Sequence, residues 1–121
     1  MINVNKGGYV MITLEHIVSF LKEIEGNYIR NRITDNPRKI ILFFITRDLS
    51  ALNSSNIVEP IIWYSQADIF NAKKEERFYR SKISKAISDL EERDIVQSRI
   101  VTINGVPRKE YRLNYDFRFK K

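Results

Sequence analysis

The chain has 121 residues, of which 43% are hydrophobic and 30% charged, and it contains no cysteine. This length and composition predict one globular domain with a modest core and exclude a disordered chain. Without cysteine the chain can form neither disulfides nor thiolate metal sites, and a single histidine makes a zinc site a poor fit. We therefore expect no cofactor and no metal.

Positive charge is concentrated in the C-terminal half of the chain. The formal net charge is +6; residues 1–64 contain seven Lys and Arg against six Asp and Glu, whereas residues 65–121 contain fourteen against nine. This asymmetry favours a polyanionic partner for the second half, although an ordinary solubilising surface gives the same pattern.

No long apolar segment is visible. The longest apolar run, residues 40–45, is far shorter than the roughly 20 residues that a membrane-spanning helix needs. Residues 1–12 contain no apolar stretch of the kind found in a signal peptide. We expect a cytoplasmic protein with no membrane partner.

The first dozen residues predict a loose arm, and a helix follows it. Thr13 is a suitable N-cap, and Gly26-Asn27 is a suitable stop. Between them apolar residues recur at helical spacing: Leu14, Ile17, Val18, Leu21 and Ile24. This apolar stripe either packs on its own domain or forms a dimer interface.

Two further helices are predicted in the middle of the chain. Asn36-Pro37 predicts a helix start, with Asn as the cap, and the helix should run to about Leu52. Residues 40–45 are apolar on nearly every side, so this helix is either central to the core or has one side in a dimer interface. After a β-prone run at 61–64, Ser65 and Asp68 form an approximate capping box for a short helix that ends near residues 72–74.

Residues 75–93 predict a helix with two contrasting faces. Its core stripe consists of Phe78, Ile83, Ala86, Ile87 and Leu90. Between residues 77 and 88 there is no acidic residue. The other face is basic and rich in hydroxyl groups: Arg77, Arg80, Ser81, Lys82, Ser84, Lys85 and Ser88.

Residues 96–103 and 106–113 predict a β-hairpin around Asn104-Gly105, because a type I′ turn needs two residues at positive φ. A two-residue turn fixes the register and leaves Pro107 where it has no ladder hydrogen bond to lose. In this register one face of the hairpin carries three arginines: Arg99, Arg108 and Arg112.

The order helix, short strand, helix, helix, strand, turn, strand resembles the winged helix-turn-helix family. The closest local match is Lys82 to Val96, in which a hydroxyl and a basic residue precede small and apolar residues, and Leu-Glu-Glu precedes the strand. Asp94 stands where the family usually has Gly, and Asp tolerates the left-handed conformation better than most residues. The resemblance covers residues 37–113.

The resemblance implies a mainly α fold with a small antiparallel β wing, an α+β winged helix-turn-helix with an extra N-terminal helix. We expect residues 1–36 to form the arm and helix, a candidate dimerisation element, and residues 37–121 to form the winged helix domain.

The resemblance also implies sequence-specific binding of double-stranded DNA by a transcriptional regulator that acts as a homodimer. Residues 77–93 would lie in the major groove, and the wing, residues 96–113, would lie on the backbone or in the minor groove. We expect no enzymatic activity and no small-molecule ligand. The expected DNA contacts are Arg77, Arg80, Ser81, Lys82, Ser84, Lys85, Ser88, Arg99, Arg108 and Arg112.

Two other functions fit the same fold. The domain could be a protein-interaction module of a transcription or replication assembly, in which case the basic face is incidental. It could also be the DNA-binding part of a plasmid or viral replication or partition system.

Overall fold

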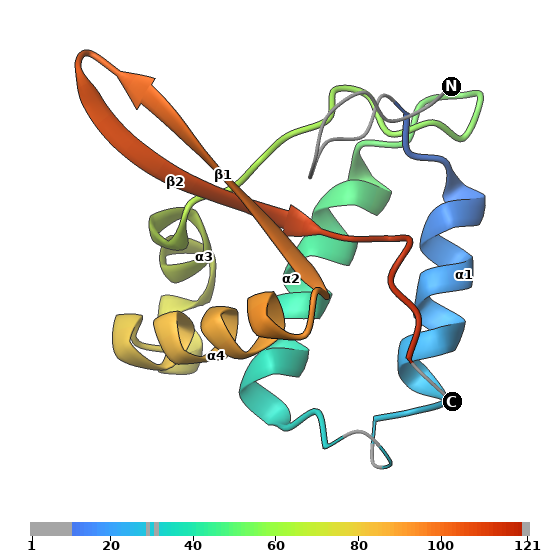
Figure 1. Ribbon diagram of the computed structural model, residues 1–121. Helices are drawn as coiled ribbons and strands as arrows, with labels where there is room; N and C mark the ends of the chain where they lie inside the picture. The colour runs from blue at the N-terminus through green and yellow to red at the C-terminus, as the bar shows by residue number, and fades with distance from the viewer. Residues whose placement is uncertain (1–10, 29, 31, 120–121) are drawn as a thin grey trace.

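The computed structural model describes residues 11–28, 30 and 32–119, which form four α-helices and one two-stranded antiparallel sheet (Figure 1). This arrangement confirms the α+β layout. The expected arm lies largely outside the described residues. None of the described helices is long and apolar enough to cross a membrane. The elements are α1 (Leu14–Glu25), α2 (Asp35–Ser50), α3 (Gln66–Lys73), a 3-10 turn (Lys74–Glu76), α4 (Arg80–Glu92), β1 (Val96–Ile103) and β2 (Val106–Leu113).

Helix α1 begins where the sequence predicts. The Thr13 hydroxyl accepts a hydrogen bond from the His16 N–H at 3.3 Å, and the Thr13 N–H donates to His16 Nδ1 at 3.1 Å. The single histidine of the chain is therefore part of a helix cap. The apolar stripe of α1 packs on its own chain, since Ile17, Phe20 and Ile24 are buried in the same cluster as residues of α2 and α4.

Helix α2 lies at the centre of the core. It begins two residues earlier than predicted, with Thr34 rather than Asn36 as the N-cap, and it ends at Ser50 rather than near Leu52. Pro37 is tolerated because it is still in the first turn, where backbone N–H groups have no partner within the helix. Buried side chains occur on nearly every side of α2: Pro37, Ile40, Ile41, Phe43, Phe44, Ile45 and Asp48.

Helix α4 is shorter than predicted at its N-terminus. The sequence predicts a continuous helix over 75–93, but α4 begins at Arg80, and Lys74–Glu76 is a 3-10 turn. Arg77 has a φ of 57°, in the left-handed region, which interrupts the helical hydrogen-bond pattern. The next residue, Phe78, is buried in the core. This turn separates α3 from α4.

The hairpin has the predicted turn and register. Asn104 and Gly105 have φ values of 52° and 79°, the positive values that a type I′ turn requires. Asp94, before β1, has a φ of 66°, which confirms its left-handed conformation. The strand pairs include Arg99 with Glu110, Gln97 with Arg112, Ser98 with Tyr111, and Ile103 with Val106.

Two segments outside the helices hold the base of the hairpin. The run 61–64 makes a single bridge to β2 rather than a strand: the Tyr64 N–H donates to the Tyr111 carbonyl at 2.9 Å, and the Tyr111 N–H donates back at 2.7 Å. After β2 the chain runs along α1 (Figure 1), where the Phe119 N–H donates to the Glu23 carboxylate at 2.8 Å. This C-terminal segment is packed and does not extend the strand.

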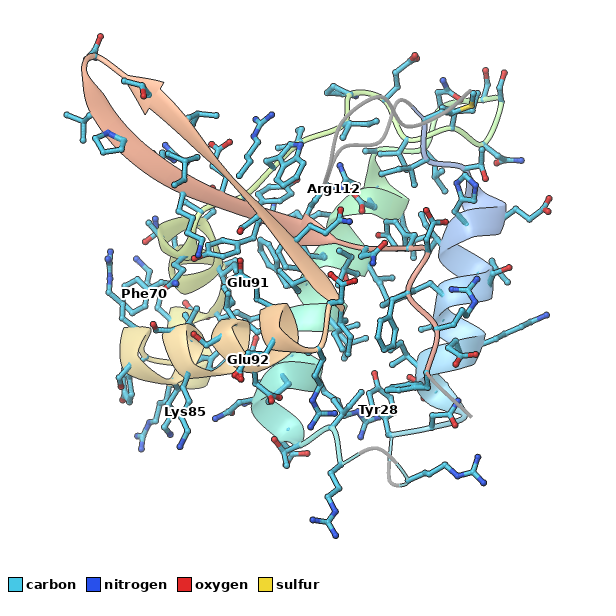
Figure 2. The ribbon with its side chains drawn as sticks, viewed as in Figure 1. Tyr28, Phe70, Lys85, Glu91, Glu92 and Arg112 are labelled. Atoms are coloured by element: carbon cyan, nitrogen blue, oxygen red, sulfur yellow. The ribbon has the colours of Figure 1, made fainter. Side chains whose placement is uncertain are left out.

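The predicted position of Arg112 on a DNA-facing surface is wrong. Arg112 is 1% exposed, and its Nη2 lies 3.8 Å from Asp48 Oδ2 on α2 (Figure 2). Its guanidinium carbon lies 5.6 Å from the centroid of the Trp63 ring. The base of the hairpin packs on α2, and Arg112 is buried because it lies on the face of β2 that is turned toward this helix. Asp48 supplies the opposite charge.

Asp48 is buried with two polar partners. Burial raises the pKa of its carboxyl above the ordinary value, while a hydrogen bond from the Tyr115 hydroxyl and the charge of Arg112 act in the opposite direction. A buried ion pair of this kind is costly to break from one side, because the remaining charge stays out of water.

We expect Phe20→Ala to lower the free energy of unfolding by about 3–5 kcal/mol, because Phe20 is buried in the common core and its ring meets the Tyr115 ring edge-on at 5.3 Å. Urea denaturation measures the change. The control is Val18→Ala on the same helix, where the side chain is exposed. Equal small effects of both substitutions would show that α1 is not part of the core.

We expect Arg112→Met to destabilise the fold by on the order of 3 kcal/mol at neutral pH. The loss should shrink in acid. Burial raises the folded-state pKa of Asp48 and the charge of Arg112 opposes part of that rise, so the stability that this pair contributes is present where Asp48 is ionised and is lost as pH falls through the raised pKa. Urea denaturation at several pH values measures both effects. A loss of stability that does not depend on pH would contradict the ion pair.

Candidate nucleic-acid interface

The outer face of α4 carries hydroxyl and cationic side chains without a carboxylate over its first nine residues, 80–88. Ile83, Ala86, Ile87 and Leu90 hold the opposite face in the core, as predicted. Residues three and seven positions apart share one side of a helix. The exposed residues therefore form two neighbouring rows, a serine row of Ser81, Ser84 and Ser88 and a lysine row of Lys82 and Lys85.

The cations of α4 differ in how firmly they are held. The Arg80 guanidinium carbon lies 5.0 Å from the centroid of the Phe70 ring on α3. Lys82 Nζ lies 6.0 Å from the Tyr79 ring. Lys85 is exposed on the outer side of the helix (Figure 2). Within the part of the chain that the structure describes, none of these three cations has a carboxylate partner within 4.0 Å.

The start of α4 is also open and positively charged. Its N-cap residue is Tyr79, which makes no side-chain capping bond and is 52% exposed. No acidic residue lies in the first turn. The positive end of the helix dipole and the first backbone N–H groups are therefore not offset by a nearby carboxylate of α4. Arg77, in the turn before the helix, is exposed as well.

A groove separates the lysine row from the start of α2. Its volume is about 590 Å³. Four cationic side chains and one carboxylate are among the residues that line it: Arg32, Lys82, Lys85, Arg93 and Asp89. Arg93 is engaged, since its Nη2 donates to the Arg32 carbonyl at 3.2 Å and its Nε lies 3.4 Å from Asp89.

Arg32 belongs to this basic surface, although it is not among the contact residues predicted from the sequence. Arg30 and Arg32 lie just before the predicted start at Asn36-Pro37, and this basic connector was the available signal. The fold brings Arg32 beside α4, which extends the cationic surface beyond the predicted helix.

The three arginines of the hairpin do not form an open cationic face. Arg99 donates from Nη2 to Glu110 Oε1 at 2.9 Å and lies over the Trp63 ring at 4.7 Å. Arg108 pairs with Asp68 at 3.4 Å and with Glu110 at 3.4 Å. Both side chains remain close to half exposed, whereas Arg112 is buried. Each hairpin arginine thus has a carboxylate partner within the protein.

The N-terminus of α3 is occupied by a carboxylate. The Ser65 N–H donates to Asp68 Oδ2 at 2.9 Å, and the Asp68 N–H donates to the Ser65 hydroxyl at 3.2 Å, which confirms the predicted capping box. Asp68 also pairs with Arg108. A phosphate at this helix end would have to lie beside the Asp68 charge.

The opposite face of the hairpin is tied to the end of α4. Glu91 accepts hydrogen bonds from the Ser98 hydroxyl at 2.5 Å and from Lys109 Nζ at 3.3 Å. Glu91 therefore faces the hairpin and not the exposed side of α4. At the acidic end of α4, the charge of Glu91 is therefore partly neutralised by Lys109 of the hairpin.

Of the ten predicted contact residues, nine are exposed. Seven of these nine lie together on α4 and on the turn that precedes it. Arg99 and Arg108 lie on the hairpin with carboxylate partners, and Arg112 is excluded by burial. Among the described residues no cluster of three or more His, Asp or Glu is placed to hold a metal ion.

Comparisons of the chain with protein-family models, with curated proteins and with solved structures found no match.

Proposed function

We propose that this protein is a winged helix DNA-binding protein that acts as a transcriptional regulator. The observation that carries the proposal is the outer face of α4, where Arg80, Lys82 and Lys85 accompany three serines with no carboxylate between residues 80 and 88. A helix fits the major groove of duplex DNA, and short hydroxyl side chains allow its backbone to approach the bases. Lysine and arginine on the same face can donate to phosphates and to guanine acceptors.

The arrangement around α4 gives each cation a role. Lys85 and Arg77 are suited to phosphates because both are exposed. Arg80 and Lys82 lie near the open start of the helix, from which side chains reach base edges in proteins that read DNA with a helix. The groove with Arg32 offers the neighbouring backbone a further cationic surface.

A homodimer is part of the proposal, because a two-fold protein matches a palindromic DNA site. On α1 the residues Ile17, Phe20 and Ile24 are buried in their own chain, so we assign the contact to the outer side of α2. Leu42 and Leu49 lie seven residues apart on α2 and are both exposed.

We expect Lys85→Ala to weaken binding about equally for all duplexes and to lower the salt slope by about one unit, because Lys85 would contact a phosphate. Lys82→Ala should weaken only preferred duplexes, by about 1–3 kcal/mol, if Lys82 reads a base. Duplexes selected from a random pool and titrated by fluorescence anisotropy at several salt concentrations supply both values.

Lys22→Ala is the matched control, since Lys22 is an exposed lysine on α1. It should leave affinity and salt slope nearly unchanged. Absence of duplex binding at low salt, or binding that does not respond to salt, would refute the DNA-binding proposal and favour a protein-interaction module.

We expect the chain to sediment as a dimer at micromolar concentration, and Leu49→Glu to give a monomer because it places a charge in the proposed contact. Sedimentation velocity measures the mass, with Ser50→Glu, an exposed neighbour on the same helix, as the control. A monomeric wild-type protein, both with and without DNA, would refute the dimer.

A further inference from the structure

The outer half of the hairpin exposes an unusual amount of apolar side chain. Ile100 is 70% exposed, Val106 is 63% exposed and Ile103 is 47% exposed. The turn end of the hairpin projects away from the helices (Figure 1). Ile103 and Val106 are cross-strand partners on either side of the Asn104-Gly105 turn, so their side chains lie next to each other on one face. The tip therefore presents a pair of β-branched side chains to solvent.

The charged residues of the hairpin nearest to this tip are cationic. Residues 100–109 contain Arg108 and Lys109 and no carboxylate. The next residue, Glu110, is buried and lies between Arg99 and Arg108. Arg108 and Lys109 are paired with carboxylates toward the base of the hairpin, but both side chains remain close to half exposed. An apolar tip beside such cations fits a partner that has an apolar interior behind an anionic surface. Duplex DNA has this chemistry, since stacked bases lie between two phosphate backbones.

The arginines of the hairpin serve to hold it in place. Arg99 and Arg108 are paired with Glu110 and Asp68, and Arg99 also lies over the Trp63 ring. On the other face Glu91 of α4 accepts from Ser98 and Lys109. The base of the hairpin is thus fixed from both sides, to α3 and to α4. An arginine of the hairpin could reach into a DNA groove only if its ion pair with Glu110 or Asp68 were broken. Ile103 and Val106 are apolar and form no ion pair, so their insertion breaks none.

We propose that the hairpin tip enters the minor groove as an apolar wedge, with Ile103 and Val106 inserted at a base step, and that this insertion bends the duplex. Apolar side chains inserted from the minor groove unstack neighbouring bases and bend DNA toward the major groove. The inference deepens the proposed function and rests on it: α4 positions the protein on the duplex, and the wedge sets the shape of the bound DNA.

The experiment uses the full chain and a selected duplex with a fluorescent donor at one end and an acceptor at the other. Wild-type protein should raise the energy transfer, because bending shortens the distance between the ends. The double variant Ile103→Thr, Val106→Thr keeps β-branched side chains on the strands but makes the tip polar. This variant should bind the same duplex with roughly tenfold lower affinity than the wild type. The bound duplex should stay straight.

The matched control is Ile100→Thr, which makes the same change at an exposed isoleucine on the other face of the hairpin. It should bend DNA as the wild type does. Far-ultraviolet circular dichroism checks that all variants fold alike.

Two readouts separate the possible failures. Anisotropy reports binding, and energy transfer reports bending. Wild-type protein that binds the duplex without bending it, or a tip variant that bends it fully, overturns the wedge and leaves DNA binding through α4 intact. Absence of binding by wild-type protein overturns both. A tip that instead meets a protein partner would leave both DNA readouts the same in wild type and variant, which also overturns the wedge.

Discussion

The contact between Arg112 on β2 and Asp48 on α2 fixes the base of the hairpin against the helical core. Their nearest charged atoms are 3.8 Å apart, both side chains are buried, and the Tyr115 hydroxyl donates to the same carboxylate. Because neither charge can return to water without disrupting the core, β2 has little freedom to slide or rotate on α2. The bridge between Tyr64 and Tyr111 adds backbone hydrogen bonds at the same point.

The geometry of the exposed surfaces follows from this anchor. Once the base of β2 is fixed, the hairpin register fixes which residues reach its tip, and Ile103 and Val106 are placed at the projecting end. Glu91 then connects the hairpin to α4, so that the helix and the wing are parts of one frame. In the proposed function, these contacts determine the distance along one duplex between the contact made by α4 and the contact made by the hairpin tip.

Local signals in the sequence were sufficient for much of the fold. Thr13 and Ser65 cap the predicted helices, and Asn104-Gly105 fixes the hairpin and its register, because caps and tight turns depend on a few neighbouring residues. The break at Arg77 was missed because a left-handed arginine has no local signature, and the apolar spacing of residues 78–90 continues across it.

The burial of Arg112 and the position of Arg32 were not predictable from local signals, because both depend on contacts between segments far apart in the chain. Alternation along a strand correctly placed Arg99, Arg108 and Arg112 on one face. It could not show that this face is turned toward α2 at its base and toward Trp63 and Asp68 further out. The candidate surface on α4, in contrast, follows from helical spacing alone, and its residues are exposed as expected.

The most direct test of the account is an NMR titration of isotope-labelled protein with a selected duplex, in which each backbone amide reports its own surroundings. DNA binding through α4 predicts that the largest shift changes fall on residues 80–88 and on the hairpin tip, with little change on α1. Changes confined to the outer side of α2, or no changes at all at low salt, would contradict the central claim that the basic face of α4 binds DNA.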